Sequence, residues 1–271
     1  MDKTSESGQS ITLHDARPEP KRWTAFTILG AFAPRAIMLV FGVILILWIN
    51  RAEGGIGTTS TNLFGYHALL MAMFTVVFTQ EAILAYSAPL WGPFVPDAKV
   101  IKAFHGFLHF LGLICCICGL VAIAKFKNDQ GSPAAYPNYT LYSAHSWVGV
   151  AALSLWALQF IGGLFTYLFA EVELKRKVSK YHKFLGSVVY AAFLATCAMG
   201  LEDMQQSDLA TSTPPANVTA DQAMASTMAG MNMANMGPIT GYLPNSNLSY
   251  YATSGSVLLL VCGLFTFLTK V

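Results

Sequence analysis

The chain has 271 residues, of which 54% are hydrophobic and only 11% are charged, and its formal net charge is +2. A soluble domain carries about 25% charged residues, so this composition excludes an ordinary soluble protein and predicts one surrounded by a lipid bilayer. The net charge is too small to indicate a nucleic-acid partner, because binding to phosphates needs a strongly basic surface.

Six apolar stretches are long enough to cross a bilayer, which takes about 20 residues. In chain order, these predicted spans are 25–49, 63–86, 101–124, 144–169, 182–202 and 251–269. The polar residues 1–24 are expected to form a cytosolic tail, and they lack the apolar core of a signal peptide. Residues 25–271 then form one all-α membrane domain with six transmembrane helices, which includes a polar, methionine-rich connection at 203–250.

Three features of these segments receive a simple interpretation. Arg35, inside the first span, is predicted to extend to the near membrane surface, as long basic side chains do. The five cysteines lie in apolar runs and are interpreted as small hydrophobic residues. The methionines of 203–250 suit Cu(I), which prefers thioethers, but we favour a flexible or interfacial non-cytosolic loop.

The basic residues predict the orientation of the chain. With the N-terminus in the cytosol, 13 of the 16 Lys and Arg residues fall on the cytosolic side of the six spans, as the positive-inside rule requires. The three Asn-x-Ser/Thr sequons, at Asn138, Asn217 and Asn247, then all lie on the other side, where glycosylation is possible. Both termini are therefore expected in the cytosol, with the protein in an endomembrane (vesicle, vacuole or lysosome) or in the plasma membrane.

Four histidines, His67, His105, His145 and His182, lie near the starts of four apolar runs. Spans two and four run toward the cytosol, so His67 and His145 should share a non-cytosolic depth. Spans three and five run the other way, so His105 and His182 should share a cytosolic depth. A ligand pair drawn from both depths would have to bridge most of the ~30 Å hydrocarbon core.

Two facing imidazole pairs, one in each leaflet, are typical of two bis-histidine haem sites inside a helical bundle. Zinc is a weaker interpretation, because no nearby Cys or carboxylate completes a set of four ligands. His109 lies one turn after His105 on the same helical face, which makes it a rival ligand or a lining residue between the sites. The alternative from another class is a haem-free, proton-coupled transporter whose intramembrane histidines relay protons.

Four short motifs surround these histidines: Tyr142-Ser143-x-His145-Ser146-Trp147-Val148-Gly149, Leu63-Phe64-x-x-His67, Lys102-x-x-His105 with His109 one turn later, and Met199-Gly200-Leu201-Glu202. They resemble motifs of the transmembrane cytochrome b-561 family, the ascorbate-reducible di-haem cytochromes. The first motif is specific to that family and the other three are moderately so. The resemblance covers about residues 37–205 and includes all four histidines.

The resemblance implies a four-helix di-haem core made by spans two to five, with two flanking helices. It implies two haem b groups, one held by His67 and His145 on the non-cytosolic side and one held by His105 and His182 on the cytosolic side. The implied activity is an ascorbate-dependent transmembrane oxidoreductase, with no catalytic residue separate from haem. Its electrons pass from cytosolic ascorbate to monodehydroascorbate or a ferric chelate on the other side.

Two positions depart from the family pattern. Ala68 stands where a proline is common after the first histidine, and Ser87 stands where many members have an arginine associated with the cytosolic ascorbate site. The departure at Ser87 affects the expected contacts between the protein and the donor. A second alternative function keeps the two haems but makes the protein a quinol-linked electron carrier. Family members are often homodimers, so a homodimer is a possible assembly.

Candidate substrate residues lie at both membrane surfaces. Lys99 and Lys102 come just before His105, and Lys183 adjoins His182, so these cations are placed to attract anionic ascorbate; each would also serve as a topology marker. A further set of polar residues precedes His145: Asn138, Tyr142 and Ser143. This set resembles the family's non-cytosolic substrate motif, and its side chains are able to hydrogen-bond a polyol or a chelated ferric ion. Asn and Ser near a helix start equally serve as helix caps.

Overall fold

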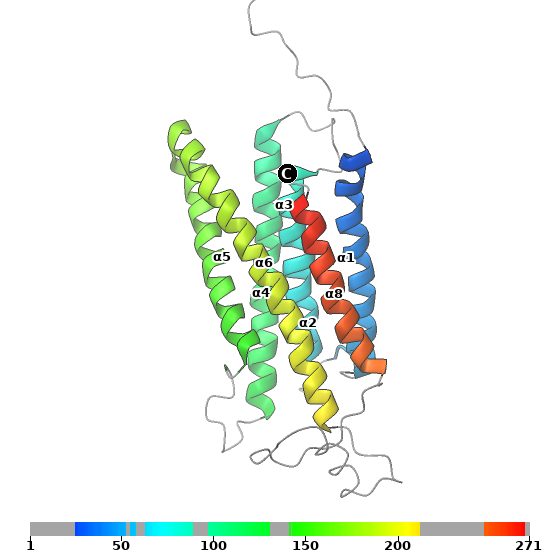
Figure 1. Cartoon of the computed structure of the whole chain (residues 1–271). Coiled ribbons are helices and arrows are strands. Elements are labelled where there is room, and N and C mark those ends of the chain that lie inside the picture. Colours follow the sequence, from blue (N-terminus) through cyan, green and yellow to red (C-terminus); the bar gives the residue numbers. More distant parts are fainter. Residues whose placement is uncertain are drawn as a thin grey trace, which may run out of the picture.

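In the computed structural model, all regular secondary structure in the described part of the chain is helical. The structure describes residues 25–52, 55–57, 63–88, 97–130, 141, 143–211 and 247–268. The helices are α1 (Ala25–Ala52), α2 (Leu63–Ala72), the π-helix η2 (Met73–Thr79), α3 (Gln80–Ser87), α4 (Ala98–Gln130), α5 (Ala144–Phe169), α6 (Val172–Thr211) and α8 (Asn247–Leu268). They form six rods in one bundle (Figure 1), because α2, η2 and α3 continue one another without a break.

The described helices have the length and apolar composition of membrane spans. Five of the rods are long and apolar enough to cross a bilayer, and α8 contributes a shorter apolar stretch, Thr253–Phe267. Large apolar side chains cover the outside; on α5, Leu158 is 69% exposed and Ile161 is 64% exposed. Such a surface is stable only against lipid or another apolar partner. The chain is an integral, multi-pass membrane protein, and the predicted all-α class is confirmed.

Successive rods run in opposite directions (Figure 1). The starts of α1, α4 and α6 and the ends of α3 and α8 lie at one end of the bundle, which we call the α3 end. The starts of α2, α5 and α8 lie at the other end, which we call the α2 end. This antiparallel order brings segments that are distant in the sequence to the same depth.

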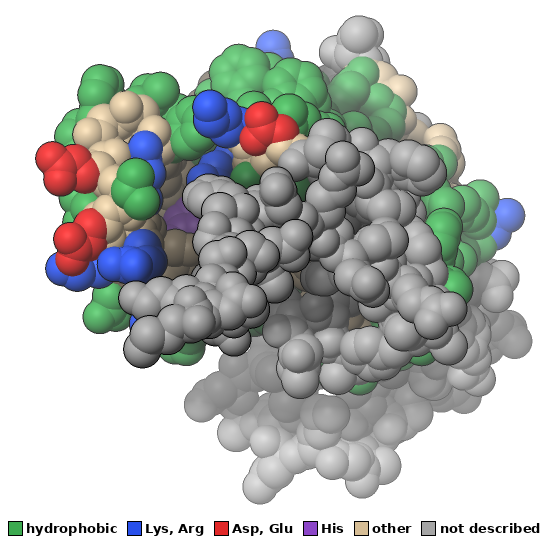
Figure 2. Space-filling model, turned by 90° about the horizontal axis from the view of Figure 1, so that it is seen from above, with side chains coloured by type: hydrophobic (Ala, Val, Ile, Leu, Met, Phe, Trp, Pro, Cys, Tyr) green, Lys and Arg blue, Asp and Glu red, His purple; other side chains and the backbone are tan. Residues whose placement is uncertain are grey.

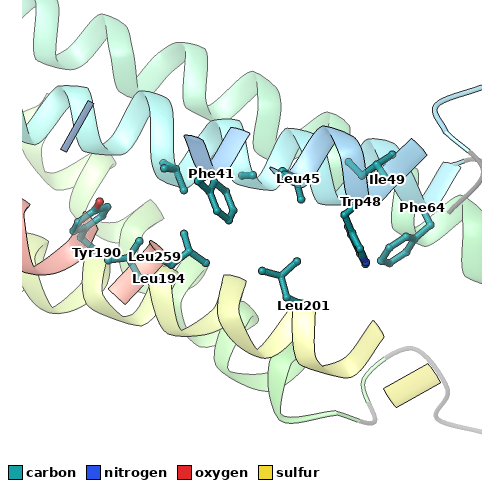
Figure 3. Close-up of a cluster of buried hydrophobic side chains, with 11 residues drawn as sticks. Phe41, Leu45, Trp48, Ile49, Phe64, Tyr190, Leu194, Leu201 and Leu259 are labelled. Atoms are coloured by element: carbon teal, nitrogen blue, oxygen red, sulfur yellow. The ribbon is translucent and has the colours of Figure 1, made fainter. Parts of the chain in front are cut away.

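The rods form a group of four and two flanking helices that are in extensive contact with it. The α2–η2–α3 rod packs on α4, α5 packs on α6, and η2 contacts α6; α1 and α8 pack on each other, and α8 also packs on α6. A buried cluster joins the two groups (Figure 3); its labelled members are Phe41, Leu45, Trp48, Ile49, Phe64, Tyr190, Leu194, Leu201 and Leu259. There the indole nitrogen of Trp48 points toward the Phe64 ring, whose centroid is 6.4 Å from that of Trp48 at an interplanar angle of 78°. This arrangement suits an N–H···π contact.

Two features differ from the expectations. Helix α6 begins at Val172, ten residues before the predicted span, because the intervening Lys-rich segment consists mostly of good helix formers. The prediction for Arg35 was wrong: its side chain does not extend to the surface but is 11% exposed and forms an ion pair with Glu81. Because Glu81 belongs to a neighbouring rod, an argument from the first helix alone does not identify it as the partner of Arg35.

Candidate metal centres

The four histidines meet as two pairs, one at each end of the bundle. The ring centroids of His67 and His145 are 6.2 Å apart, and those of His105 and His182 are 6.1 Å apart. An imidazole nitrogen lies about 2 Å from a bound first-row metal ion and its ring centre about 1 Å further, so two rings on opposite sides of one ion have centres about 6 Å apart. Both pairs match that separation.

Backbone carbonyls orient three of the four rings. Nδ1 of His67 lies 3.1 Å from the Gly119 carbonyl oxygen. Nδ1 of His145 lies 2.8 Å from that of Thr196, and Nδ1 of His105 lies 2.8 Å from that of Ala82. A carbonyl only accepts hydrogen bonds, so each Nδ1 carries the proton and each Nε2 keeps a lone pair. This tautomer, fixed by a carbonyl behind the ring, is the usual arrangement of a metal-binding histidine.

Two glycines allow the rings to lie against the neighbouring helix. A Cβ atom on Gly200 of α6 would lie 2.8 Å from Cε1 of His145, and one on Gly163 of α5 would lie 3.3 Å from Cε1 of His182. In addition, the backbone carbonyl of His182 accepts a hydrogen bond from Nε2 of Gln159 at 3.0 Å. Helix α6 therefore leaves space for His145 of α5, and α5 leaves space for His182 of α6.

The two pairs are far apart along the helices of the bundle. Eighteen residues of α5 separate His145 from Gly163, which touches His182, and eighteen residues of a helix extend about 27 Å. On α4, fourteen residues separate His105 from Gly119, which binds His67, and they extend about 21 Å. No single ion can bind ligands from both pairs, so each pair would need an ion of its own.

The donor set suits haem better than a bare ion. In the described part of the chain, no group of three or more His, Cys, Asp or Glu side chains is close enough to hold a metal. A structural zinc ion needs four such ligands, whereas haem iron takes its equatorial ligands from the porphyrin and only axial ligands from the protein. Two imidazoles at this separation fit the pair of protein ligands that haem b would take, and in three of the four rings Nε2 keeps a lone pair for a metal.

His109 occupies a different place from the paired histidines. Its ring centroid is 4.6 Å from that of His105, and its Nδ1 accepts a hydrogen bond from the indole Nε1 of Trp156 at 3.3 Å. In a neutral imidazole the other nitrogen, Nε2, then carries the proton and cannot bind a metal. The structure thus favours a lining role for His109, beside an aromatic group that includes Trp156, Phe160 and Phe74.

The three candidate lysines lie near the His105/His182 pair. Lys99 and Lys102 are exposed in the first turns of α4, and Lys183 is exposed next to His182. Figure 2 looks onto the α3 end and shows a histidine side chain between lysine and arginine side chains. A positive rim beside an accessible imidazole can attract an anion.

At the α2 end, the structure describes one of the three candidate substrate residues. Ser143 is the N-cap of α5, and its hydroxyl oxygen accepts a hydrogen bond from the backbone N–H of Ser146 at 3.4 Å. The capping interpretation therefore accounts for Ser143. Asn138 and Tyr142 lie outside the described residues, as do residues 212–246 of the methionine-rich connection.

Sequence reasoning missed two polar residues of the second span. Gln80 is fully buried; its Oε1 accepts hydrogen bonds from the Tyr190 hydroxyl at 2.8 Å and from the Cys262 thiol at 2.8 Å. Glu81 binds Arg35. An ionisable residue inside an apolar span is expensive and usually has a partner, so Glu81 could have been noticed as the counterpart of Arg35.

The fold is that of a multi-pass helical membrane protein, and its paired histidines are suited to hold haem between the helices. The family model for eukaryotic cytochrome b561 matches residues 66–207, which include all four paired histidines. The chain belongs to this family of transmembrane oxidoreductases.

Similar proteins occur in plants and animals. Over 187 residues the chain is 30% identical to the transmembrane ascorbate ferrireductase 2 of Arabidopsis thaliana, covering 65% of this chain and 76% of that protein. Over 221 residues it is 28% identical to the lysosomal membrane ascorbate-dependent ferrireductase CYB561A3 of Homo sapiens, covering 80% of this chain and 85% of that protein. The probable ascorbate-specific transmembrane electron transporter 1 of Oryza sativa subsp. japonica is 27% identical over 175 residues, with 62% and 70% covered.

Proposed function

We propose that this protein transfers single electrons across a membrane from cytosolic ascorbate to an acceptor on the other side, either monodehydroascorbate or a ferric chelate. Ascorbate gives up one electron and one proton and becomes monodehydroascorbate. On the other side, a ferric ion gains the electron and becomes ferrous, or monodehydroascorbate gains an electron and a proton and becomes ascorbate. The names of the relatives support both the donor and a ferric acceptor.

The observation that carries this proposal is the presence of two opposed histidine pairs at the two ends of one bundle. His105 and His182 would hold one haem b, and His67 and His145 would hold a second. When bound, haem b supplies a one-electron carrier inside a medium that otherwise excludes charge. The protein would contribute the histidine nitrogens that hold the group, the carbonyls that fix the tautomer of three of these histidines, and an apolar surrounding that excludes water.

The distribution of basic residues supports the direction of transfer. Among the lysines and arginines that the structure describes, most lie toward the α3 end. Basic residues favour the cytosolic side, and both termini would then be cytosolic. Lys99, Lys102 and Lys183 border the His105/His182 pair on that side and would attract the ascorbate anion. At the α2 end, Asn138, Tyr142 and Ser143 would contact the acceptor.

Reconstituted vesicles test this proposal. Protein is inserted into liposomes that enclose a ferric chelate with a ferrous indicator, and external chelate is removed. We expect external ascorbate to produce ferrous ion inside, with no such signal in vesicles of the His105→Gln variant. Reduction by a quinol but not by ascorbate would support the quinol-linked alternative and contradict the proposed donor.

A further inference from the structure

The Arg35 guanidinium binds both ends of α3. Its Nε and one terminal nitrogen donate to Oε2 of Glu81, at 3.1 and 2.7 Å. The other terminal nitrogen donates to the carbonyl oxygens of Ala31, at 2.5 Å, and of Ala88, at 3.1 Å. Glu81 is the second residue of α3 and Ala88 directly follows its last residue, so one side chain of α1 fixes this short helix at two points.

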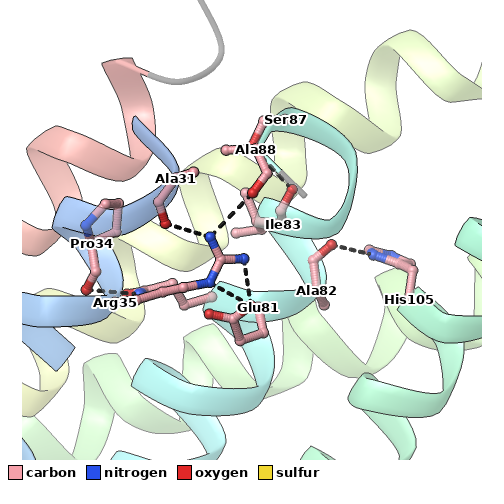
Figure 4. Close-up of polar contacts among 10 residues, drawn as sticks. Ala31, Pro34, Arg35, Glu81, Ala82, Ile83, Ser87, Ala88 and His105 are labelled. Carbon is pink, nitrogen blue, oxygen red and sulfur yellow. Dashed lines mark hydrogen bonds and ion pairs between the residues drawn. The ribbon is translucent and has the colours of Figure 1, made fainter. Parts of the chain in front are cut away.

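His105 binds the opposite side of the same helix. Between Glu81 and Ala88 lies Ala82, whose carbonyl oxygen accepts the Nδ1–H of His105 at 2.8 Å. Figure 4 shows Arg35 and His105 on opposite sides of α3, with Glu81 and Ala82 as neighbours in the chain between them. Any movement of α3 relative to α4 would change the hydrogen bond to His105.

The position of α3 needs such an external restraint. Helix α3 has only eight residues and follows the seven-residue π-helix η2, whose wider turns interrupt the regular register of the rod. A buried ion pair is weak evidence for added stability, because desolvation of the two charges offsets their attraction; its best-attested use is to fix a register. Here the fixed register is that of the carbonyl behind His105.

We propose that Arg35 and Glu81 are positioning residues for His105, acting through the Ala82 carbonyl. This inference rests on the proposed haem b at the His105/His182 pair. A carbonyl that accepts the Nδ1–H of a histidine raises the basicity of its Nε2. A more basic axial ligand favours ferric over ferrous iron, so the Arg35–Glu81 pair lowers the midpoint potential of the haem at this pair.

The decisive variant is Arg35→Gln, examined by redox titration of the haem-loaded protein in detergent. Loss of the guanidinium releases α3 and weakens the bond to His105, so the midpoint potential of the haem at His105/His182 rises while that of the other haem is unchanged. A direct effect of charge predicts the opposite sign, because Arg35→Gln would leave the Glu81 carboxylate uncompensated and lower the potential. A lowered or unchanged potential would overturn the inference.

The double variant Arg35→Gln/Glu81→Gln adds an independent criterion. The net charge of the pair is then the same as in the wild type, so a purely electrostatic effect disappears, whereas the positioning account predicts that the raised potential persists. Arg51→Gln serves as a matched control, because this arginine also belongs to α1 but contacts Tyr251 at the α2 end. It should leave the potential of the His105/His182 haem unchanged.

The proposed function and the positioning role of Arg35 and Glu81 are contradicted by different results. Wild-type protein that takes up no haem under loading conditions would contradict the proposed function, and this inference with it. Wild-type protein with two haems and an Arg35→Gln variant with unshifted potentials would contradict this inference alone.

Discussion

At the scale of the residue, the tautomer separates three of the proposed ligands, His67, His105 and His145, from the neighbouring His109. His105 donates its Nδ1–H to a carbonyl, whereas His109 accepts an N–H at the same atom from Trp156. The first arrangement leaves Nε2 free for a metal, and the second places a proton there. Two histidines one helical turn apart thus have different chemistry because of their partners on other helices.

This difference predicts the outcome of replacing each histidine. His109→Gln should keep both haems, because the side chain lines the site without binding iron, while His105→Gln should lose one haem per chain. The haem-to-protein ratio of the purified variants measures this directly. Loss of a haem in His109→Gln together with a full complement in His105→Gln would reverse the assignment.

Gly200 gives a second prediction at this scale. In Gly200→Ala the new methyl group would lie 2.8 Å from Cε1 of His145, so the ring has to move and the haem at His67/His145 should be lost. Gly42→Ala is the control, because a Cβ atom there meets nothing within 4 Å. Both changes favour the helix by about 1 kcal/mol, so equal haem contents in the two variants would contradict the close approach.

The sequence predicts the four paired histidines and their matching depths, because an apolar run gives the direction of each helix and the position of a residue along it. It does not predict the partner of each Nδ1, since the carbonyls of Ala82, Gly119 and Thr196 belong to helices whose rotation depends on packing. For the same reason it leaves His109 as a rival ligand and places Arg35 wrongly. Contacts between helices, rather than depth, were the missing information.

At the scale of the element, the second rod differs from the other rods in being interrupted. Its middle is a π-helix, and directly afterwards Gln80 and Glu81 bring polar side chains into the interface with α1, α6 and α8. π-helical turns occur mostly as single interruptions of α-helices, frequently at functional sites. The sequence predicts the length of this rod but not the interruption, because the apolar pattern of 73–79 is compatible with either helix type.

Gln80 should contribute to stability through its buried hydrogen bonds. Gln80→Leu leaves the Tyr190 hydroxyl and the Pro34 carbonyl without the amide that they bind, and a buried polar group that loses its partner costs about 1–3 kcal/mol. Titration with a denaturing detergent should show a lowered free energy of unfolding. Asn50→Leu, which removes an exposed amide that donates to the Ile46 carbonyl of its own helix, should not lower this free energy. An equal loss in both variants would argue against the buried contacts.

At the scale of the whole molecule, the antiparallel order of the rods gives the two ends different chemistry. The α3 end has an accessible histidine between basic side chains (Figure 2). The α2 end carries the other histidine pair, about 21 to 27 Å away along the helices. One end is thereby suited to an anionic donor, and the second pair lies at the opposite end of the bundle.

A comparison of two lysines on α4 tests the role of the basic end. Lys102→Gln should raise the ascorbate concentration needed for half-maximal haem reduction several-fold at low ionic strength, with a smaller difference in high salt because exposed charges are screened. Lys125→Gln, an exposed lysine near the other end of the same helix, should leave that concentration unchanged. Equal effects of the two variants would show that Lys102 has no local role.

The central claim is that each end of the bundle holds one haem b between two histidines. The most direct test is the number of haem b groups per chain, measured spectroscopically on purified wild-type protein and on the His145→Gln and His182→Gln variants. We expect about two in the wild type and about one in each variant, with the remaining haem differing in midpoint potential between the variants. A fully loaded wild-type protein with no haem, or a number unchanged by both replacements, would contradict the account.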